Sequence, residues 1–309
     1  MTRLTTELSS GKVADVRQVL DGNHNYLTSL ERSLEVLNGY SVANTEAAYL
    51  METMQTSLEN VQNFGSELGL DLILAGGGPI GVVSGNQSEN ARTQLSATLN
   101  SLNDDVAGRS LFAGAATDTV PLPDADELIA LVRAEVLGQT TPEDIFAAAK
   151  AWFDDPAGFD TVAYSGSNTS LAPFVLSDTE RVSLDIRANN PAIKELLMNM
   201  SVAALADDPG LALDVPTQSE LFGIAGLGLQ SNQDQLTRVR TTIGFVEGRV
   251  ETISARNQAE EIGTEFARNA LLASDPFEAA TQLESVQFQL ESLYTITVRS
   301  SQLRLVNFL

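Results

Sequence analysis

Apolar residues recur at alternating steps of three and four in the first part of the chain. The stripe comprises Leu27, Leu30, Leu34 and Leu37 and, after a break at Asn38-Gly39, Met51, Met54, Leu58, Val61, Gly65 and Leu68. This spacing places the side chains on one face of an amphipathic helix. A second segment with the same spacing runs from Leu95 to Val106, and Gly108 follows it as a candidate C-terminal cap.

The most regular pattern lies later in the chain. Leu236, Val239, Ile243, Val246, Val250 and Ile253 alternate steps of three and four without an interruption. This is the spacing of a heptad seam, which a helix buries against a partner helix.

The last segment carries a helix start signal followed by another seam, which comprises Leu283, Val286, Leu290 and Leu293. Asp275 is placed to cap, Pro276 suits the first helical position, and Glu278 completes a capping box. A helix over 275–309 would be roughly 50 Å long and would need a partner of similar length to bury its seam. We therefore expect the first and last segments to lie side by side.

The middle of the chain, residues 115–216, interrupts the helical pattern. It holds eight of the ten prolines, so no long helix crosses it. Thr141-Pro142 and Asn190-Pro191 start short helices, and residues 161–164, 174–176 and 181–187 are predicted as short strands. We expect its aromatic residues, Trp152, Phe153, Phe159, Tyr164 and Phe174, to form a core of their own.

These patterns together predict a mainly α fold. It consists of a long antiparallel helical rod, formed by paired N-terminal and C-terminal segments, with a small α+β insert domain. The expected divisions are rod helices over 1–114, an outer insert domain over 115–216, and helices completing the rod over 217–309.

Composition narrows the functional classes. The 309 residues carry 18 Lys+Arg against 41 Asp+Glu, for a formal charge of −23. A nucleic acid or an anionic membrane surface would be repelled, so neither is an expected partner. The chain has no cysteine and one histidine, His24, which argues against disulfides, a zinc site and a conventional hydrolase triad.

Segments that direct a protein to a membrane are not evident. No apolar run approaches transmembrane length, and the first residues have no apolar h-region of a cleaved signal peptide. If the protein leaves the cell, we expect a route that needs no cleaved signal.

Several motifs that suggest catalysis have simpler explanations. Residues 76–81 fit the G-x-G-x-x-G pattern, but no series of βαβ units follows, so we interpret them as a turn between antiparallel helices. The carboxylate pairs at 104–105, 154–155 and 207–208 point different ways on a helix and suit solvated positions. We expect no catalytic, cofactor-binding or metal-binding residues, no cofactor, and no enzymatic activity.

Three short segments carry a resemblance to a known family. Gly108, Arg109, Leu111, Phe112 and Gly114 match a Gly-Arg-aromatic-Leu-Phe-Ala-Gly segment of bacterial flagellar hook-filament junction proteins, with Ser110 in place of the aromatic residue. Residues 8–12, Leu-Ser-Ser-Gly-Lys, resemble a signature that these proteins share with flagellins. Residues 275–280, 292–296 and 303–309 resemble the family's C-terminal assembly helix.

The resemblance covers about residues 1–114 and 229–309, and it leaves the insert unassigned. In the family the Ser-Ser-Gly run lies farther into the chain than Ser9. We therefore expect part of the family's N-terminal arm to be missing from this sequence, through truncation, a misplaced start codon or a real shortening.

The resemblance implies a structural subunit that joins hook to filament and is found outside the cell in the flagellum. Its expected partners are copies of itself in a ring or helical layer, other axial proteins such as hook-associated proteins and flagellin, and an export chaperone. The implied assembly interface comprises Leu4, Leu8, Leu290, Leu293, Leu303, Leu305, Val306, Phe308 and Leu309.

Two other functional classes stay open at this point. Flagellin, the filament subunit, shares both termini with the junction proteins, although the segment at 108–114 favours the junction. An unrelated hydrolase or binding protein with a pocket in the insert is the third. A ligand-dependent rise in melting temperature would support that third class, whereas copy number would distinguish the first two.

Overall fold

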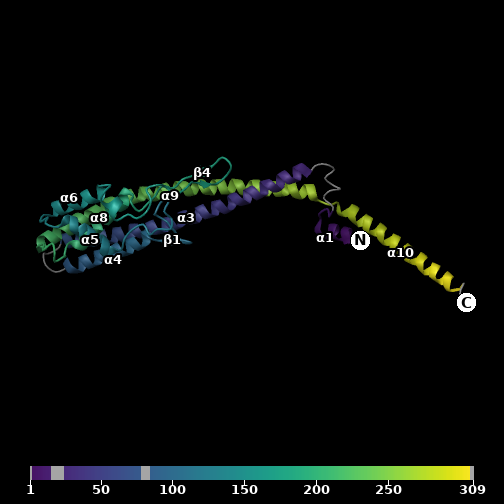
Figure 1. Cartoon of the computed structure of the whole chain (residues 1–309), viewed down its shortest axis with the longest axis horizontal. Coiled ribbons are helices and arrows are strands. Elements are labelled where there is room, and N and C mark those ends of the chain that lie inside the picture. The colour runs from purple at the N-terminus through teal and green to yellow at the C-terminus, as the bar shows by residue number, and fades with distance from the viewer. Residues whose placement is uncertain (1, 15–23, 78–83, 307–309) are drawn as a thin grey trace. The chain divides into compact units, whose positions relative to one another are not determined.

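The computed structural model describes residues 2–14, 24–77 and 84–306 and confirms a mainly helical fold with small strands (Figure 1). The helices are α1 (Thr2–Ser10), α3 (His24–Gly76), α4 (Ser84–Leu102), α5 (Ala125–Val136), α6 (Pro142–Asp154), α7 (Phe159–Val162), α8 (Pro191–Leu205), α9 (Val215–Leu272) and α10 (Pro276–Val306). The strands are β1 (Asp105–Val106), β2 (Arg109–Ser110), β3 (Phe174–Val175) and β4 (Arg181–Val182).

The chain divides into two compact units. The larger unit is Val42–Ser254, and the terminal unit combines Met1–Ser41 with Ala255–Leu309. The long helices α3 and α9 contribute residues to both.

In the larger unit α3 and α9 lie side by side and run antiparallel. Gln62 Nε2 donates to Thr237 Oγ1 at 3.0 Å, Gln230 Nε2 to the Ser66 carbonyl at 3.0 Å, and Ser219 Oγ to the Ala75 carbonyl at 3.3 Å. Residue numbers rise along one helix as they fall along the other. The predicted heptad seam of α9 is confirmed, since Leu236, Ile243, Val250 and Ile253 are all buried. The partner of α3 here is α9, rather than the segment 275–309 that the sequence suggested.

The helix α3 continues through the break that the sequence suggested at Asn38-Gly39. An exposed glycine costs a helix only about 1 kcal/mol, which a helix of this length tolerates. Of the glycine-rich run at 76–81, Gly76 ends α3, and positions 78–81 lie outside the described residues.

Side-chain caps start the short helices of the middle region where the sequence predicts them. Thr141 Oγ1 accepts from the Asp144 N–H at 3.2 Å, and Asn190 Oδ1 accepts from the Ala192 N–H at 3.0 Å. These acceptors satisfy amide groups that the first helical turn leaves without partners. Each helix then begins with proline, which suits that position because it lacks an N–H.

The strands of the middle region are fewer than expected. The pair β3 and β4 is antiparallel, with Phe174 opposite Val182. Residues 161–162 instead end the short helix α7, where the Val162 N–H donates to the Gly158 carbonyl at 2.8 Å. That local hydrogen bond satisfies the backbone without a neighbouring strand.

The helix α8 lies at the centre of the larger unit and packs against α4, α5 and α6. Nearly every residue from Ala192 to Leu205 is buried, whichever face of α8 it occupies. A Cβ added to Gly65 on α3 would lie 2.6 Å from Leu196 Cδ1, so α8 also contacts α3. Asn232 Nδ2 on α9 donates to the Ala192 carbonyl at 3.0 Å. The insert therefore supplies a helix to the core of the long helices.

The expected separate aromatic core is thus only part of a larger one. Trp152 and Phe153 have ring centroids 5.0 Å apart, and Phe153 stacks on Phe159 at 5.0 Å. These rings belong to the same continuous cluster as Met54 on α3 and Leu236 on α9. A chain with one such cluster buries more apolar area than two small cores would.

Glycines let α3 and α9 approach closely at one end of their pairing. A Cβ on Gly226 would lie 2.7 Å from the Gly69 carbonyl oxygen, and a Cβ on Gly76 would lie 2.7 Å from Gly223 Cα. Both contacts involve backbone, which cannot move aside as a side chain can. Only glycine fits at this crossing.

Candidate assembly site

The segment 108–114, on which the family resemblance rests, forms a hairpin turn and the loop that follows it. Ala107 and Gly108 have φ values of 52° and 77° between β1 and β2. Two consecutive positive φ values match the tight hairpin turn that suits twisted strands. Gly108 is therefore a turn residue, and the predicted role as a helix cap is wrong because α4 already ends at Leu102.

Each motif residue after the turn has a contact inside the larger unit. Arg109 pairs with Glu46 of α3, and Leu111 and Phe112 are buried. The Phe112 carbonyl accepts from the Ala188 N–H at 2.9 Å. A Cβ on Gly114, where φ is 63°, would lie 2.5 Å from the Ser167 carbonyl oxygen. The motif thus connects the hairpin to the middle region through these contacts. The packing around each position explains why the motif has these residue types.

The buried side chain of Tyr164 packs beneath this loop. The ring is 4% exposed, and its hydroxyl donates to the Ser167 carbonyl at 3.1 Å. Burial raises the pKa of Tyr164 to about 12, because the charged phenolate would lose its hydration.

We expect stability to fall as pH rises from about 10 toward 12. The unfolded chain ionises its tyrosines near pH 10, whereas folded Tyr164 stays neutral up to about pH 12. The stabilisation lost over this range is at most about 2–3 kcal/mol by linkage. Urea unfolding at pH 9, 10 and 11 measures it. Tyr164→Phe should reduce the fall of the unfolding free energy with pH, whereas Tyr26→Phe, which changes an exposed ring, should not. Equal pH dependence in the two variants would show that Tyr164 is not the group responsible.

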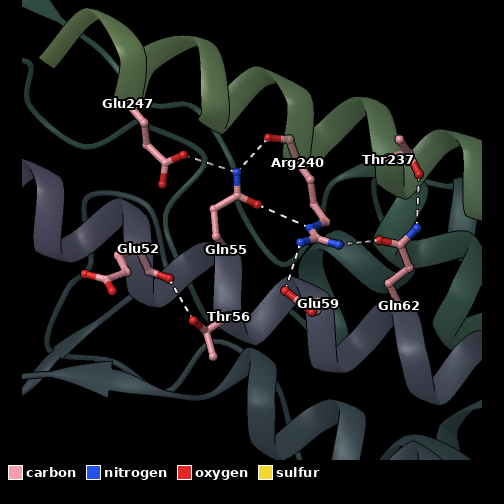
Figure 2. Close-up of polar contacts among 8 residues, drawn as sticks. All are labelled: Glu52, Gln55, Thr56, Glu59, Gln62, Thr237, Arg240 and Glu247. Carbon is pink, nitrogen blue, oxygen red and sulfur yellow. Dashed lines mark hydrogen bonds and ion pairs between the residues drawn. The ribbon is translucent and has the colours of Figure 1, made fainter. Parts of the chain in front are cut away.

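A layer of polar side chains fixes the register of α3 against α9 beside the apolar seam. Figure 2 shows Arg240 of α9 reaching three acceptors on α3. Its guanidinium donates to Gln55 Oε1 at 3.2 Å, Gln62 Oε1 at 2.9 Å and Glu59 Oε2 at 3.1 Å. Gln55 Nε2 donates back to the Arg240 carbonyl at 2.9 Å. A shift of one helical turn would break all of these bonds at once, so this layer specifies a single register.

The terminal unit brings two of the resembling segments together. Gly11, where φ is 64°, directly follows the end of α1, and α1 packs against α10. The Gly11 carbonyl accepts from the Ser274 N–H at 3.0 Å, and the Val13 N–H donates to the Leu272 carbonyl at 3.0 Å. The Leu-Ser-Ser-Gly-Lys segment therefore adjoins the start of α10. Asp275 Oδ1 caps α10 as predicted, accepting from the Phe277 N–H at 2.8 Å.

The residues expected at an assembly interface have different exposures. Leu4 is buried, Leu8 is 41% exposed, Leu290 is half-buried and Leu293 is 58% exposed. Leu303, Leu305 and Val306 belong to the last turns of α10, whose side chains are not described, and Phe308 and Leu309 lie outside the described residues.

Large apolar side chains are exposed along the described part of α10 and the end of α9. On α10 they are Phe277, Phe288, Leu293, Tyr294, Ile296 and Val298, and on α9 within the terminal unit they are Ile262 and Phe266. Contiguous exposed apolar surface is uncommon on a monomer and marks interaction surfaces. Sequence reasoning missed most of these residues because they flank the seam rather than belong to it.

Within residues 2–14, 24–77 and 84–306, no three His, Asp or Glu side chains gather in a way that could hold a metal ion. His24 is exposed at the start of α3. No helix in these same ranges is both long and apolar enough to cross a membrane.

The larger unit therefore combines two long antiparallel helices with an inserted region that shares their core. No family model matches the sequence, and no curated protein matches it. One similar solved structure comes from Vibrio parahaemolyticus and carries the provisional description of a flagellar hook-associated protein. It is 13% identical with a TM-score of 0.54, and the match covers 81% of this chain and 99% of that one. At this identity the likeness shows a shared fold.

Proposed function

We propose that this chain is a structural, non-enzymatic subunit of the bacterial flagellum that joins hook to filament and assembles through its terminal helices. The fold of the solved neighbour, described as flagellar and hook-associated, supports this proposal. The three resembling segments support it independently, because they come from the sequence. Two of those segments adjoin in the terminal unit, where an assembly core would form.

The observation that carries the proposal is the exposed apolar surface of α10. Leu293, Tyr294, Ile296 and Val298 lie within two turns, and each is more than half exposed. Burying side chains of this size contributes about 1.5–3 kcal/mol each. Four such side chains contribute about 6–12 kcal/mol before the entropy lost on association is subtracted, so several helices must contact one another to form a stable assembly.

The proposed partners follow from the same assembly. They are further copies of the chain in a ring or helical layer, neighbouring axial proteins, and a chaperone that covers the terminal helices during export without a cleaved signal. The alternative is that the chain is flagellin, the filament subunit. The segment at 108–114 favours the junction protein instead. Quantifying copies per flagellum separates the two, because a filament contains far more subunits than a junction does.

Deleting residues 276–309 tests the proposed function. We expect the shortened protein to stay monomeric in sedimentation and its cells to lose motility. The melting temperature of the larger unit should stay unchanged, because α9 and α8 rather than α10 cover the seam of α3 there.

A point variant makes the same test without removing the helix. Ile296→Asp should abolish assembly, while Gln287→Asp adds the same charge at an exposed polar position of α10 and should not. Normal assembly and motility of both the deletion and the Ile296→Asp variant would refute the proposed role of α10.

A further inference from the structure

An asparagine occupies a seam position of α3 near the start of the larger unit. Asn44, Ala47, Met51, Met54 and Leu58 follow one another at alternating steps of three and four, and all of them are buried. This alternation is that of a heptad seam, whose members face the partner helix. Asn44 is the polar member of the series, and it is only 2% exposed.

The side-chain amide of Asn44 has no hydrogen-bond partner among the described residues. Its Oδ1 and its Nδ2 are both buried and unpaired. Other buried polar side chains of the two long helices do find partners. Ser57 Oγ donates to Asp104 Oδ2 at 3.1 Å, and Asn232 Nδ2 donates to the Ala192 carbonyl at 3.0 Å. Buried polar groups in proteins are nearly always paired, so the unpaired amide of Asn44 requires an explanation.

The facing part of α9 is apolar at the level of Asn44. Gln55 Nε2 donates to the Arg240 carbonyl, and Asn44 precedes Gln55 by about three helical turns. Because the two helices are antiparallel, Asn44 lies about three turns beyond Arg240 on the α9 side, beside Val250 and Ile253. Both of these residues are buried. Their aliphatic side chains neither donate nor accept a hydrogen bond, so the seam itself cannot satisfy the amide.

A buried amide without partners weakens the seam locally. In water both of its polar atoms are hydrogen-bonded, and burial without replacement costs each group the equivalent of about tenfold in a local equilibrium constant. Separation of the two helices around Asn44 returns the amide to water and recovers this cost. Separation at an apolar seam position such as Met51 recovers nothing, because it exposes apolar surface instead.

The segment that contains Asn44 also has less cover than the rest of α3 in the larger unit. Along residues 42–50, only Asn44 and every third residue after it are buried. Glu46 pairs with Arg109 of the hairpin, but both side chains are largely exposed, and such ion pairs contribute little. Farther along α3, a Cβ on Gly65 would collide with a side chain of α8, so α8 covers the seam there. Residues 42–50 can therefore separate from α9 without disturbing α8.

We propose that Asn44 makes residues 42–50 of α3, together with residues 250–254 of α9, a segment that opens by itself while the core around α8 stays closed. The unpaired amide is the cause, because it favours the open form of this segment over opening elsewhere in the seam. The two long helices can thus change their local pairing at this end of the larger unit without losing the fold. The inference concerns a single copy of the chain and does not depend on the proposed function.

Amide hydrogen exchange of the full-length monomer tests the inference. In the unmodified chain, amides of residues 44–50 should be about tenfold less protected than those of residues 58–68. Asn44→Leu should raise the protection of residues 44–50 about tenfold, and Asn44→Asp, which keeps the shape but adds a charge, should lower it about tenfold. The matched control Asn60→Leu makes the same change at an exposed position of α3 and should leave residues 44–50 unaffected.

Three results would overturn the inference. Equal protection of the two segments in the unmodified chain would show that no separate opening takes place. Unchanged protection in Asn44→Asp would show that the amide is already hydrated. Asn44→Val supplies a smaller apolar side chain in case leucine overfills the seam. Failure of both apolar variants to raise the protection of residues 44–50 would show that the unpaired amide is not what weakens the segment.

Discussion

Replacing residues 115–213 with a short Gly/Ser linker is expected to unfold the larger unit. The replacement removes α8, which contacts α4, α5 and α6 and packs on α3. Ile193, Leu196, Leu197, Val202 and Leu205 are all buried there. At about 1.5–3 kcal/mol for each side chain, their loss alone removes about 10 kcal/mol, comparable with the whole stability of a domain.

Circular dichroism and urea unfolding of the linker variant measure this effect. The ends of the linker keep Asp214, whose carboxylate accepts from the Thr217 N–H at 3.0 Å and caps α9. A cooperative melt with the helicity of α3, α4 and α9 intact would show that the long helices fold without α8.

A milder pair of substitutions keeps the test valid if the linker variant cannot be purified. Leu196→Ala should cost about 2–5 kcal/mol, as is usual for a fully buried leucine. Leu137→Ala, at an exposed position in the same region, should change the free energy of unfolding by less than about 0.5 kcal/mol.

Alanine in place of two glycines on α9 should shift stability in opposite directions. Gly226→Ala places a Cβ 2.7 Å from the Gly69 carbonyl oxygen and 2.8 Å from the Ile73 nitrogen. Forcing the helices apart is expected to cost about 1–3 kcal/mol, a typical value for overpacking. Gly248→Ala meets no atom within 4 Å and should gain about 0.5–1 kcal/mol from helix propensity.

Chemical denaturation of the two variants and the unmodified chain provides the measurement, at a protein concentration below that of assembly. The two substitutions are the same change on the same helix, so their difference isolates the close approach to α3. A gain in stability for Gly226→Ala would show that the crossing has room for a side chain.

The sequence predicted the parts of the fold that local chemistry determines. The seam from Leu236 to Ile253, the prolines and caps that begin α6, α8 and α10, and the mainly α class all follow from periodicity and from hydrogen bonding at helix ends. The partner of each seam could not be predicted in the same way. A stripe of correct spacing fits any helix of similar length, so α9 rather than the last segment paired with α3 in the larger unit.

The central place of α8 had a signal in the sequence that was not used. Apart from Lys194 and Glu195, its residues from Ala192 to Leu205 carry no charge, and apolar side chains occur on every face, which is typical of a helix buried on all sides. The role of Gly108 could not be predicted from its being a glycine. A glycine with positive φ occurs both at the C-terminal ends of helices and in hairpin turns. In the candidate assembly site, the seam residues Leu290 and Leu293 of α10 were predictable, whereas exposed Phe288 and Ile296 were not, because they lie outside that seam.

The antiparallel pairing of α3 and α9 has a consequence for the order in which the chain folds. Gln55 and Arg240, which meet in the polar layer, are separated by 185 positions along the chain. The chain loses entropy when so long a loop closes, and the contact stabilises the fold only after closure. Contacts of this kind therefore form slowly. The short helices α5, α6 and α8 lie between the two partners in sequence, so their collapse shortens the effective loop. We therefore expect the long helices to pair late in folding, after α5, α6 and α8 have collapsed.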